Sequence, residues 1–330
     1  MKFVWLLLFT FSSPVLLAQA ENDARPRRGD LSKEPVIQTF GGRQFWGDVR
    51  FLQGWRIQHN VLFGQYRLLD PNDRRYLTGT LEECTDRLNQ IRDEQHLRPM
   101  TGKAAVLIHG IGRSSKCFRA MGKALREDGY TVVPFEYPST RVTIEESADY
   151  LHQVLQSMPQ IESVDLVCHS MGGLLLRTYL QKHGDDRFRR AVLLGVPNHG
   201  AEMADFLKRN SLFKAILGPA GQQLVTDDDG LIAKLPAPDF PFAVIAGGRS
   251  AEKGFNPILP GDNDSTVTVA STRLAGASDF LLVPVIHSFL MTNADCIQAT
   301  RCFLKSGQLC EDRDACPIET CEQESVHDTP

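Results

Sequence analysis

The feature that most constrains the fold is a regular alternation of short apolar runs with amphipathic segments from Ala104 onward. Between two such runs, for example, Ile144, Ala148, Leu151 and Leu155 recur with helical spacing. Continuous apolar strands that alternate with helices are typical of a parallel sheet covered on both faces. The sequence therefore predicts an α/β fold with a mostly parallel central sheet. The apolar runs cover residues 104–109, 130–135, 164–168, 191–196, 242–246 and 280–285.

Two regions depart from this alternation. In residues 41–100, apolar and polar side chains alternate between Phe45 and Leu69, which predicts antiparallel strands, and a capping box of Thr80 and Glu83 then begins a helix near 81–92. The stretch 198–241 interrupts the βα alternation with short amphipathic segments. It predicts either a small helical cap or an ordinary crossover helix with a loop.

The first twenty residues have the pattern of a signal peptide. Lys2 precedes an apolar run that ends in Ala18-Gln19-Ala20, a site suited to signal peptidase. An uncleaved anchor is the alternative, but Ser12-Ser13-Pro14 interrupts the run and leaves it short for a span. We expect cleavage after residue 20, a disordered leader over 21–40, and a secreted or periplasmic protein.

Cysteines and charge narrow the expected ligands. Export favours disulfides, and four of the eight cysteines (Cys302, Cys310, Cys316 and Cys321) crowd into the acidic C-terminal end, so we expect disulfides in the tail over 306–330. No C-x-x-C pair occurs, and the acidic run at 227–229 is expected to be solvated, so neither a zinc nor a calcium site is predicted. With a net charge of −4 and no long basic run, the chain lacks the electrostatic pattern of a nucleic-acid binder.

One serine lies where a predicted strand meets a predicted helix. The sequence Cys168-His169-Ser170-Met171-Gly172-Gly173 places small residues two positions on either side of Ser170. A tight, strained turn needs small neighbours, because bulky side chains would clash there. The pattern resembles the nucleophile elbow of α/β-hydrolases, with Cys168 in place of the first glycine of G-x-S-x-G.

Upstream, the predicted strand at 104–109 ends in His109-Gly110-Ile111-Gly112. This resembles the segment that builds half of the oxyanion hole in lipases of the same fold. Such a hole needs two backbone N–H donors aimed at the developing negative charge. The resemblance implies that the amides of Ile111 and Met171 are these donors. A phosphate loop is the alternative, but the pattern is too short for a nucleotide fingerprint.

The partners of the serine are expected downstream. Asp264, followed by Ser265 and a valine-rich stretch, resembles the segment that carries the triad acid, with Asp262 as the alternative. Asn263-Asp264-Ser265 is also a glycosylation sequon. His287 follows the last predicted strand, and the order Ser, Asp, His is that of α/β-hydrolases. In such a triad the histidine takes the serine proton and the aspartate orients the imidazole.

Three other histidines fall in the same motifs. His109 and His169, with Gly110, lie in the turns that line the expected substrate pocket. His199, in Gly195-Val196-Pro197-Asn198-His199-Gly200, resembles a loop at the pocket rim of the family. We expect these residues to shape the site or contact substrate.

Together, four ordered motifs within 101–305 resemble the α/β-hydrolase superfamily, most closely secreted lipases and the GPI-inositol-deacylase-like branch. The resemblance implies a serine carboxylester hydrolase that acts without a cofactor on a hydrophobic acyl ester, with transient contact to a lipid or membrane surface. A thioesterase, amidase or acyltransferase with the same triad is the alternative, as is a binding module that keeps the fold without catalysis. The sequence leaves the oligomeric state open.

Overall fold

The computed structural model describes residues 43–201, 211–226, 229–310 and 314–319. The predicted signal peptide and leader, residues 1–40, lie outside this part, as do Asp227, Asp228 and Cys321. Residues 41–330 form one compact unit. No helix within the described residues is both long and apolar enough to cross a bilayer.

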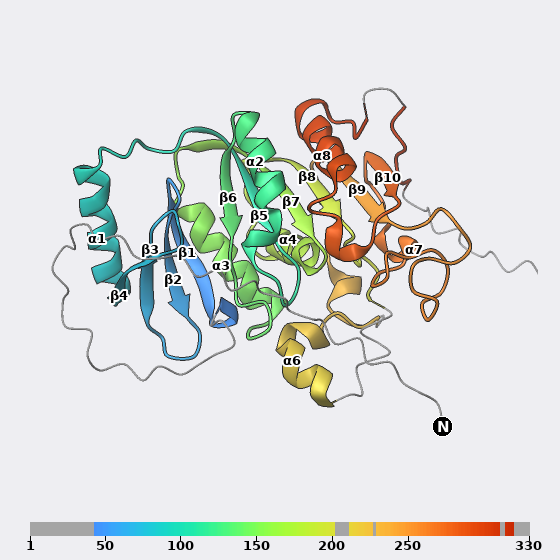
Figure 1. Ribbon diagram of the computed structural model, residues 1–330, viewed down its shortest axis with the longest axis horizontal. Helices are drawn as coiled ribbons and strands as arrows, with labels where there is room; N and C mark the ends of the chain where they lie inside the picture. The colour runs from blue at the N-terminus through green and yellow to red at the C-terminus, as the bar shows by residue number, and fades with distance from the viewer. Residues whose placement is uncertain (1–42, 202–210, 227–228, 311–313, 320–330) are drawn as a thin grey trace, which may run out of the picture. The chain divides into compact units, whose positions relative to one another are not determined.

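A six-stranded parallel sheet forms the centre of this unit (Figure 1). Its strands are ordered β10-β9-β8-β7-β5-β6, and every pairing between neighbours is parallel. The predicted parallel sheet is thus confirmed. The strands are β5 (Gly102–Ile108), β6 (Thr131–Phe135), β7 (Ile161–His169), β8 (Phe188–Leu194), β9 (Phe242–Gly247) and β10 (Asp279–Val283).

Both faces of this sheet are buried, which explains why its strands are mostly apolar. On β5, Ala104 and Val106 point into one hydrophobic cluster, while Ala105 and Leu107 point into another. The first cluster contains the buried faces of α3 (Ile144–Gln156) and α4 (Met171–Lys182). The second contains those of α2 (Arg119–Glu127) and α8 (Ala294–Ser306). Helices therefore cover the sheet on both sides.

A separate antiparallel sheet precedes this core, as predicted. It follows the short helix η1 (Arg43–Phe45) and has the order β1-β2-β3-β4. Helix α1 (Leu81–Glu94) begins with the predicted capping box and packs on this sheet through Leu88 and Ile91. Apolar side chains of the antiparallel sheet and of α1 belong to the first hydrophobic cluster of the central sheet. The N-terminal extension therefore shares a core with the central sheet. The four strands are β1 (Trp46–Leu52), β2 (Trp55–Asn60), β3 (Tyr66–Leu69) and β4 (Arg75–Gly79).

Helix α6 (Ser211–Gln222) lies between β8 and β9, within the stretch predicted as a cap or a crossover. A Cβ atom on Gly221 would lie 3.5 Å from Cδ1 of Ile111, and one on Gly218 would lie 1.9 Å from the carbonyl oxygen of Thr140. The helix thus approaches the loops that follow β5 and β6, as a cap would. Four more short helices lie within the described residues: η2 (Ser115–Phe118), η3 (Ile232–Lys234), α7 (Val269–Thr272) and η4 (His287–Phe289).

The expected disulfides of the tail are not present in the described part of the chain, where all seven cysteines are free thiols. The tail is held by hydrogen bonds instead. The amide of Cys316 donates to Oδ1 of Asp279 at 2.9 Å, and Ile318 exchanges main-chain bonds with Gly276 and Ala277. Cys168 is buried in the core, where a thiol packs as a small apolar group.

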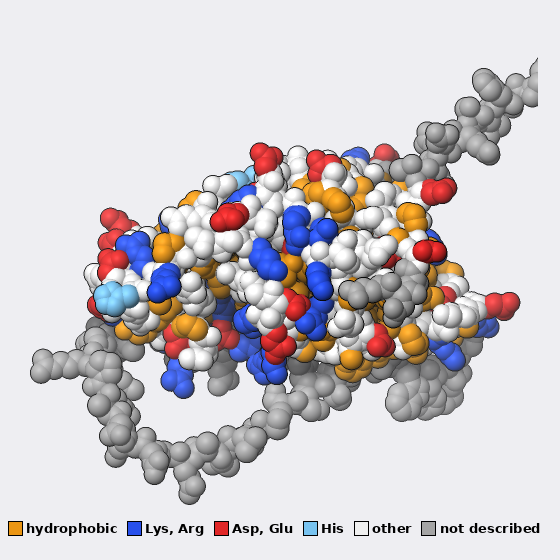
Figure 2. Space-filling model, turned by 90° about the horizontal axis from the view of Figure 1, so that it is seen from above, with side chains coloured by type: hydrophobic (Ala, Val, Ile, Leu, Met, Phe, Trp, Pro, Cys, Tyr) orange, Lys and Arg blue, Asp and Glu red, His pale blue; other side chains and the backbone are white. Residues whose placement is uncertain are grey.

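Charged side chains of both signs are spread over the face in Figure 2. Lys and Arg side chains gather near its middle, with Asp and Glu side chains beside them.

Candidate active site

Ser170 lies at a sharp junction between β7 and α4. Its backbone has φ 54° and ψ −129°, a region that costs a residue with a side chain about 1–3 kcal/mol. Two main-chain bonds hold this conformation: the Ser170 amide donates to Leu194 at 2.9 Å, and the Gly173 amide donates to Ser170 at 3.0 Å. The strained turn lifts the serine out of the strand and presents it at the carboxyl end of the sheet.

The glycines after Ser170 allow two close backbone approaches. A Cβ atom on Gly172 would lie 2.4 Å from the carbonyl oxygen of Ile108, at the end of β5. One on Gly173 would lie 2.4 Å from Cγ2 of Val196, beyond β8. Only glycine fits at these positions, and the start of α4 therefore lies directly against the loop after β5.

Asp264 and His287 form a buried pair. Oδ2 of Asp264 lies 2.6 Å from Nδ1 of His287, and the His287 amide donates to the carbonyl oxygen of Asp264 at 2.7 Å. The other carboxylate oxygen accepts the amides of Thr266 at 3.0 Å and Val267 at 2.8 Å. The carboxylate is thus held on both oxygens, and its contact with Nδ1 leaves Nε2 of His287 as the free ring nitrogen.

Asp262, the alternative acid, has a different position. Its carboxylate accepts the amides of Arg249, Ser250 and Asn263 at 2.7–2.9 Å, so it closes the loop after β9. The neighbouring sequon is buried as well. Nδ2 of Asn263 donates to the carbonyl oxygens of Asn256 and Gly261, and the side chain is fully buried, so it is inaccessible to glycosylation in the folded protein.

Two further glycines and a histidine bring the serine and the Asp–His pair together. A Cβ atom on Gly195 would lie 3.1 Å from both Oδ2 of Asp264 and Nδ1 of His287, and one on Gly110 would lie 3.3 Å from Oγ of Ser170. His169, next to Ser170, donates from Nε2 to the carbonyl oxygen of His287 at 3.1 Å. The ring centroids of these two histidines are 4.6 Å apart. The loops after β5, β7, β8, β9 and β10 therefore meet at one place.

The two amides expected to form the oxyanion hole lie on either side of this place. Met171 is the first residue of α4, where an N–H has no acceptor inside the helix. Ile111 lies between Gly110, which contacts Ser170, and Gly112, which has φ 67°. Neither amide donates a hydrogen bond to another residue of the described part. Both remain available to a ligand.

The three other histidines differ in their surroundings. His109 is buried, stacks on Tyr137 with ring centroids 4.4 Å apart, and donates from Nδ1 to the carbonyl oxygen of Gly110 at 2.8 Å. His169 is fully buried; burial first, and then the charge of His287, holds its pKa well below the usual value, so it stays neutral. The side chain of His199 is exposed, and only its main chain is bonded, to Ser271.

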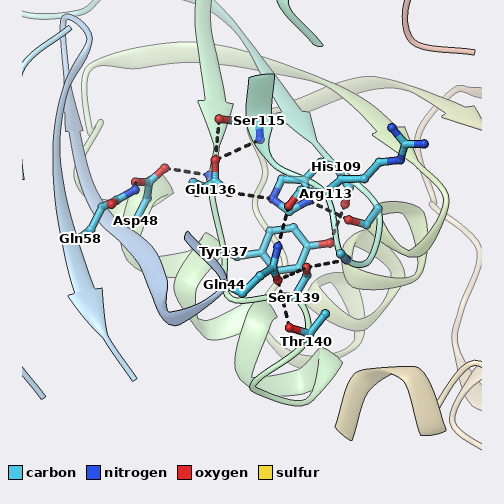
Figure 3. A network of polar contacts seen from close by, with 12 residues as sticks. Gln44, Asp48, Gln58, His109, Arg113, Ser115, Glu136, Tyr137, Ser139 and Thr140 are labelled. Carbon is cyan, nitrogen blue, oxygen red and sulfur yellow. Dashed lines mark hydrogen bonds and ion pairs between the residues drawn. The ribbon is translucent and has the colours of Figure 1, made fainter. Parts of the chain in front are cut away.

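Sequence reasoning missed several polar residues beside the site. Nε2 of His109 lies 3.5 Å from Oε1 of Glu136, whose other oxygen accepts the amide and hydroxyl of Ser115 (Figure 3). Burial alone would raise the pKa of Glu136, but His109 and Ser115 outweigh it and hold the pKa below its usual value. Glu136 follows directly after the buried strand β6, at the same edge of the sheet, and this position was the signal available in the sequence.

The rim loop is anchored by Asn198 rather than by His199. Nδ2 of Asn198 donates to Thr272 at 2.8 Å, and its oxygens accept from the buried guanidinium of Arg177. Burial lowers the pKa of Arg177 to about 10. Among the described residues no cluster of His, Cys, Asp or Glu could hold a metal ion.

Comparison with known proteins bears on the fold of the chain. Residues 79–227 match a sequence family described as a domain of unknown function, DUF7379. None of the curated proteins matches the chain. The propeptide form of lipase BlEst2 from Bacillus licheniformis is similar in structure, with a TM-score of 0.50 at 21% identity. This match covers 68% of the present chain and 53% of the lipase chain.

The chain has the α/β-hydrolase fold. Two other solved structures are similar at lower scores. The mature form of the same lipase has a TM-score of 0.46 at 21% identity, and a bromoperoxidase from Bacillus anthracis has 0.47 at 20%; each match covers 63% of this chain and 93% of the other. At 21% identity, the match to the propeptide form supports the fold alone, and no comparison marks a GPI-inositol-deacylase-like branch.

Proposed function

We propose that this α/β-hydrolase is a serine carboxylester hydrolase of the lipase or esterase type. The observation that carries the proposal is the strained Ser170 at the strand–helix junction, together with a histidine at the same edge of the sheet whose Nδ1 is 2.6 Å from a buried carboxylate. A nucleophile at a sharp turn, a base and an orienting acid are the three parts that acyl transfer through a serine requires.

The chemistry follows from the positions of these groups. Nε2 of His287 takes the proton from the hydroxyl of Ser170 as its oxygen attacks the ester carbonyl carbon. Asp264 fixes the tautomer and stabilises the imidazolium that forms. The amides of Ile111 and Met171 stabilise the negative oxygen, and loss of one such donor costs about 3–4 kcal/mol of barrier. The imidazolium then protonates the leaving alcohol, and water hydrolyses the acyl-Ser170 ester.

A hydrophobic acyl group is the proposed substrate portion. Gly221 of helix α6 lies against the side chain of Ile111, and Phe289, two residues after His287, is 56% exposed. Apolar side chains around a polar centre favour an apolar ligand. We extend the proposal to transient contact with a lipid surface. We also propose that the protein is exported after cleavage before Glu21, and N-terminal sequencing of protein from the culture medium or periplasm would test this cleavage.

The direct test is labelling with a fluorophosphonate probe, which phosphonylates an activated serine. The wild type should react and Ser170→Ala should not. Hydrolysis of p-nitrophenyl esters from acetate to laurate would then define the acyl group. An unreactive wild type would support a non-catalytic binding module, and equal rates for all chain lengths would contradict a preference for hydrophobic acyl groups.

A further inference from the structure

The loop Gly110–Arg113, which carries the proposed oxyanion donor Ile111, has little support of its own. Its one internal main-chain bond, from the Arg113 amide to Gly110, is long at 3.3 Å. Gly112 has a positive φ and no side chain to pack. An oxyanion donor must nevertheless be held in place before the reaction, because stabilisation depends on donors that need not reorganise. Other parts of the chain must therefore fix this loop.

Three side chains outside the loop hold its main chain: His109 donates from Nδ1 to the carbonyl oxygen of Gly110 at 2.8 Å, and the other two come from more distant parts of the chain (Figure 3). The hydroxyl of Ser139, which is fully buried, accepts the amide of Gly112 at 3.0 Å. Nε2 of Gln44 donates to the carbonyl oxygen of Arg113 at 2.9 Å. The first bond sets the direction of the peptide group between Ile111 and Gly112, next to the proposed donor, and the second fixes the end of the loop at Arg113.

Gln44 joins these contacts into one network. Its Oε1 accepts the hydroxyls of Ser139 at 3.0 Å and Thr140 at 3.1 Å, while its Nε2 donates to Arg113. The hydroxyl of Ser139 donates to Gln44 and accepts from Gly112, so its single proton is already assigned. A linked chain of bonds therefore runs from η1, in the N-terminal extension, to the oxyanion loop.

We propose that Gln44 is a positioning residue for the reaction: through Ser139 and Arg113, the N-terminal extension holds the oxyanion loop in its productive conformation. The inference rests on the proposed function and adds a role for a segment outside the predicted hydrolase domain. Gln44 touches neither the nucleophile nor the base; it acts through Ser139 on the peptide group between Ile111 and Gly112, and directly on the carbonyl of Arg113.

Removal of the hydrogen bonds of Gln44 should slow the chemical step and leave substrate binding unchanged. Misplacement of a reacting group by about 1 Å costs about 100-fold in rate, and loosening of one donor costs less. For Gln44→Ala we expect kcat and the second-order rate of fluorophosphonate labelling to fall about 10-fold to 100-fold, with KM within about two-fold. Gln44→Glu keeps the shape but cannot donate to Arg113, and should show a similar loss.

The structure offers a matched control and a coupling test. Gln153 lies exposed on α3 and donates from Nε2 to the carbonyl oxygen of Asp149, so Gln153→Ala removes the same type of bond far from the loop and should keep wild-type rates. Ser139→Ala combined with Gln44→Ala should lose little more than the worse single variant, because both disrupt one network.

Amide hydrogen exchange in the peptide covering residues 108–114 measures how firmly the loop is held, independently of activity. This exchange should be faster in Gln44→Ala. If the wild type reacts with the probe and both Gln44 variants react at the same rate, the inference fails while the proposed function stands. A change in KM alone, or fully additive losses in the double variant, would also overturn it. If the wild type itself does not react, both fail.

Discussion

Replacement of Gly172 by alanine tests how closely the nucleophile turn packs against the oxyanion loop. The added Cβ would lie 2.4 Å from the carbonyl oxygen of Ile108, whereas real Cβ contacts stay above 3.0 Å. The start of α4 must therefore move by at least about 0.6 Å, the difference between these two distances. That shift displaces Met171, the neighbouring residue proposed as an oxyanion donor. Since about 1 Å costs about 100-fold in rate, we expect kcat/KM to fall by about 10-fold or more.

The effect of Gly172→Ala on stability is smaller, because two terms oppose each other. Overpacking costs about 1–3 kcal/mol, while replacing glycine by alanine in a helix gains up to about 1 kcal/mol. We expect a net loss of about 0–2 kcal/mol in the free energy of unfolding, measured by urea titration.

Gly122→Ala is the matched control, since Gly122 is also a buried helical glycine. A Cβ there would meet Leu107 and Val132 at 3.4 Å, an ordinary contact, so this variant should gain about 0.5–1 kcal/mol and keep its activity. If Gly172→Ala hydrolyses esters and reacts with the fluorophosphonate probe at the wild-type rates, the reasoning is refuted. The close approach of Gly172 to Ile108 would then have no bearing on the position of the Met171 amide.

Three further outcomes are expected. Asp264→Asn should lower kcat by about 10⁴-fold through the wrong imidazole tautomer, whereas Asp262→Asn should keep kcat within about ten-fold, as measured on one p-nitrophenyl ester. The lowered pKa of Glu136 stabilises the fold above pH 4.5, the usual value of this carboxyl, and that stability is lost as pH falls through the folded pKa. The urea midpoint should therefore fall in acid, and fall less in Glu136→Gln. In native protein Cys316, which is exposed, should react with Ellman's reagent, whereas Cys168, whose thiol pKa is raised by burial, should react only after unfolding.

The sequence predicted the elements whose residues carry a periodic signal. The apolar runs became the parallel strands, because both faces of the sheet are covered and most strand positions are buried. The capping box at Thr80 appears with both of its bonds, since it depends only on residues three apart. The order of Ser170, Asp264 and His287 pointed to residues that lie at one edge of the sheet, because parallel strands all end there.

Contacts between distant segments had no comparable signal. Gln44 and Ser139 are 95 residues apart, and neither lies in a periodic pattern, so nothing local indicated that their side chains meet. The tail was expected to need disulfides because its cysteines are close in sequence. The tail is instead bonded to Asp279 at the start of β10, which only the folded chain brings near.

Buried polar contacts of Asp48 on β1 explain how the N-terminal antiparallel sheet can hold the loop Gly110–Arg113 accurately. Asp48 is buried on β1, and burial raises the pKa of its carboxyl. Its oxygens accept Nε2 of Gln58 at 2.7 Å and the amide of Glu136 at 2.8 Å. A slip of β1 by one residue would turn Asp48 to the opposite face and leave both donors unpaired. It would also shift Gln44, four residues earlier, by about 3.4 Å, which is too far to reach Arg113. These directional bonds allow a single register, and that register sets the position of the loop beside Ser170.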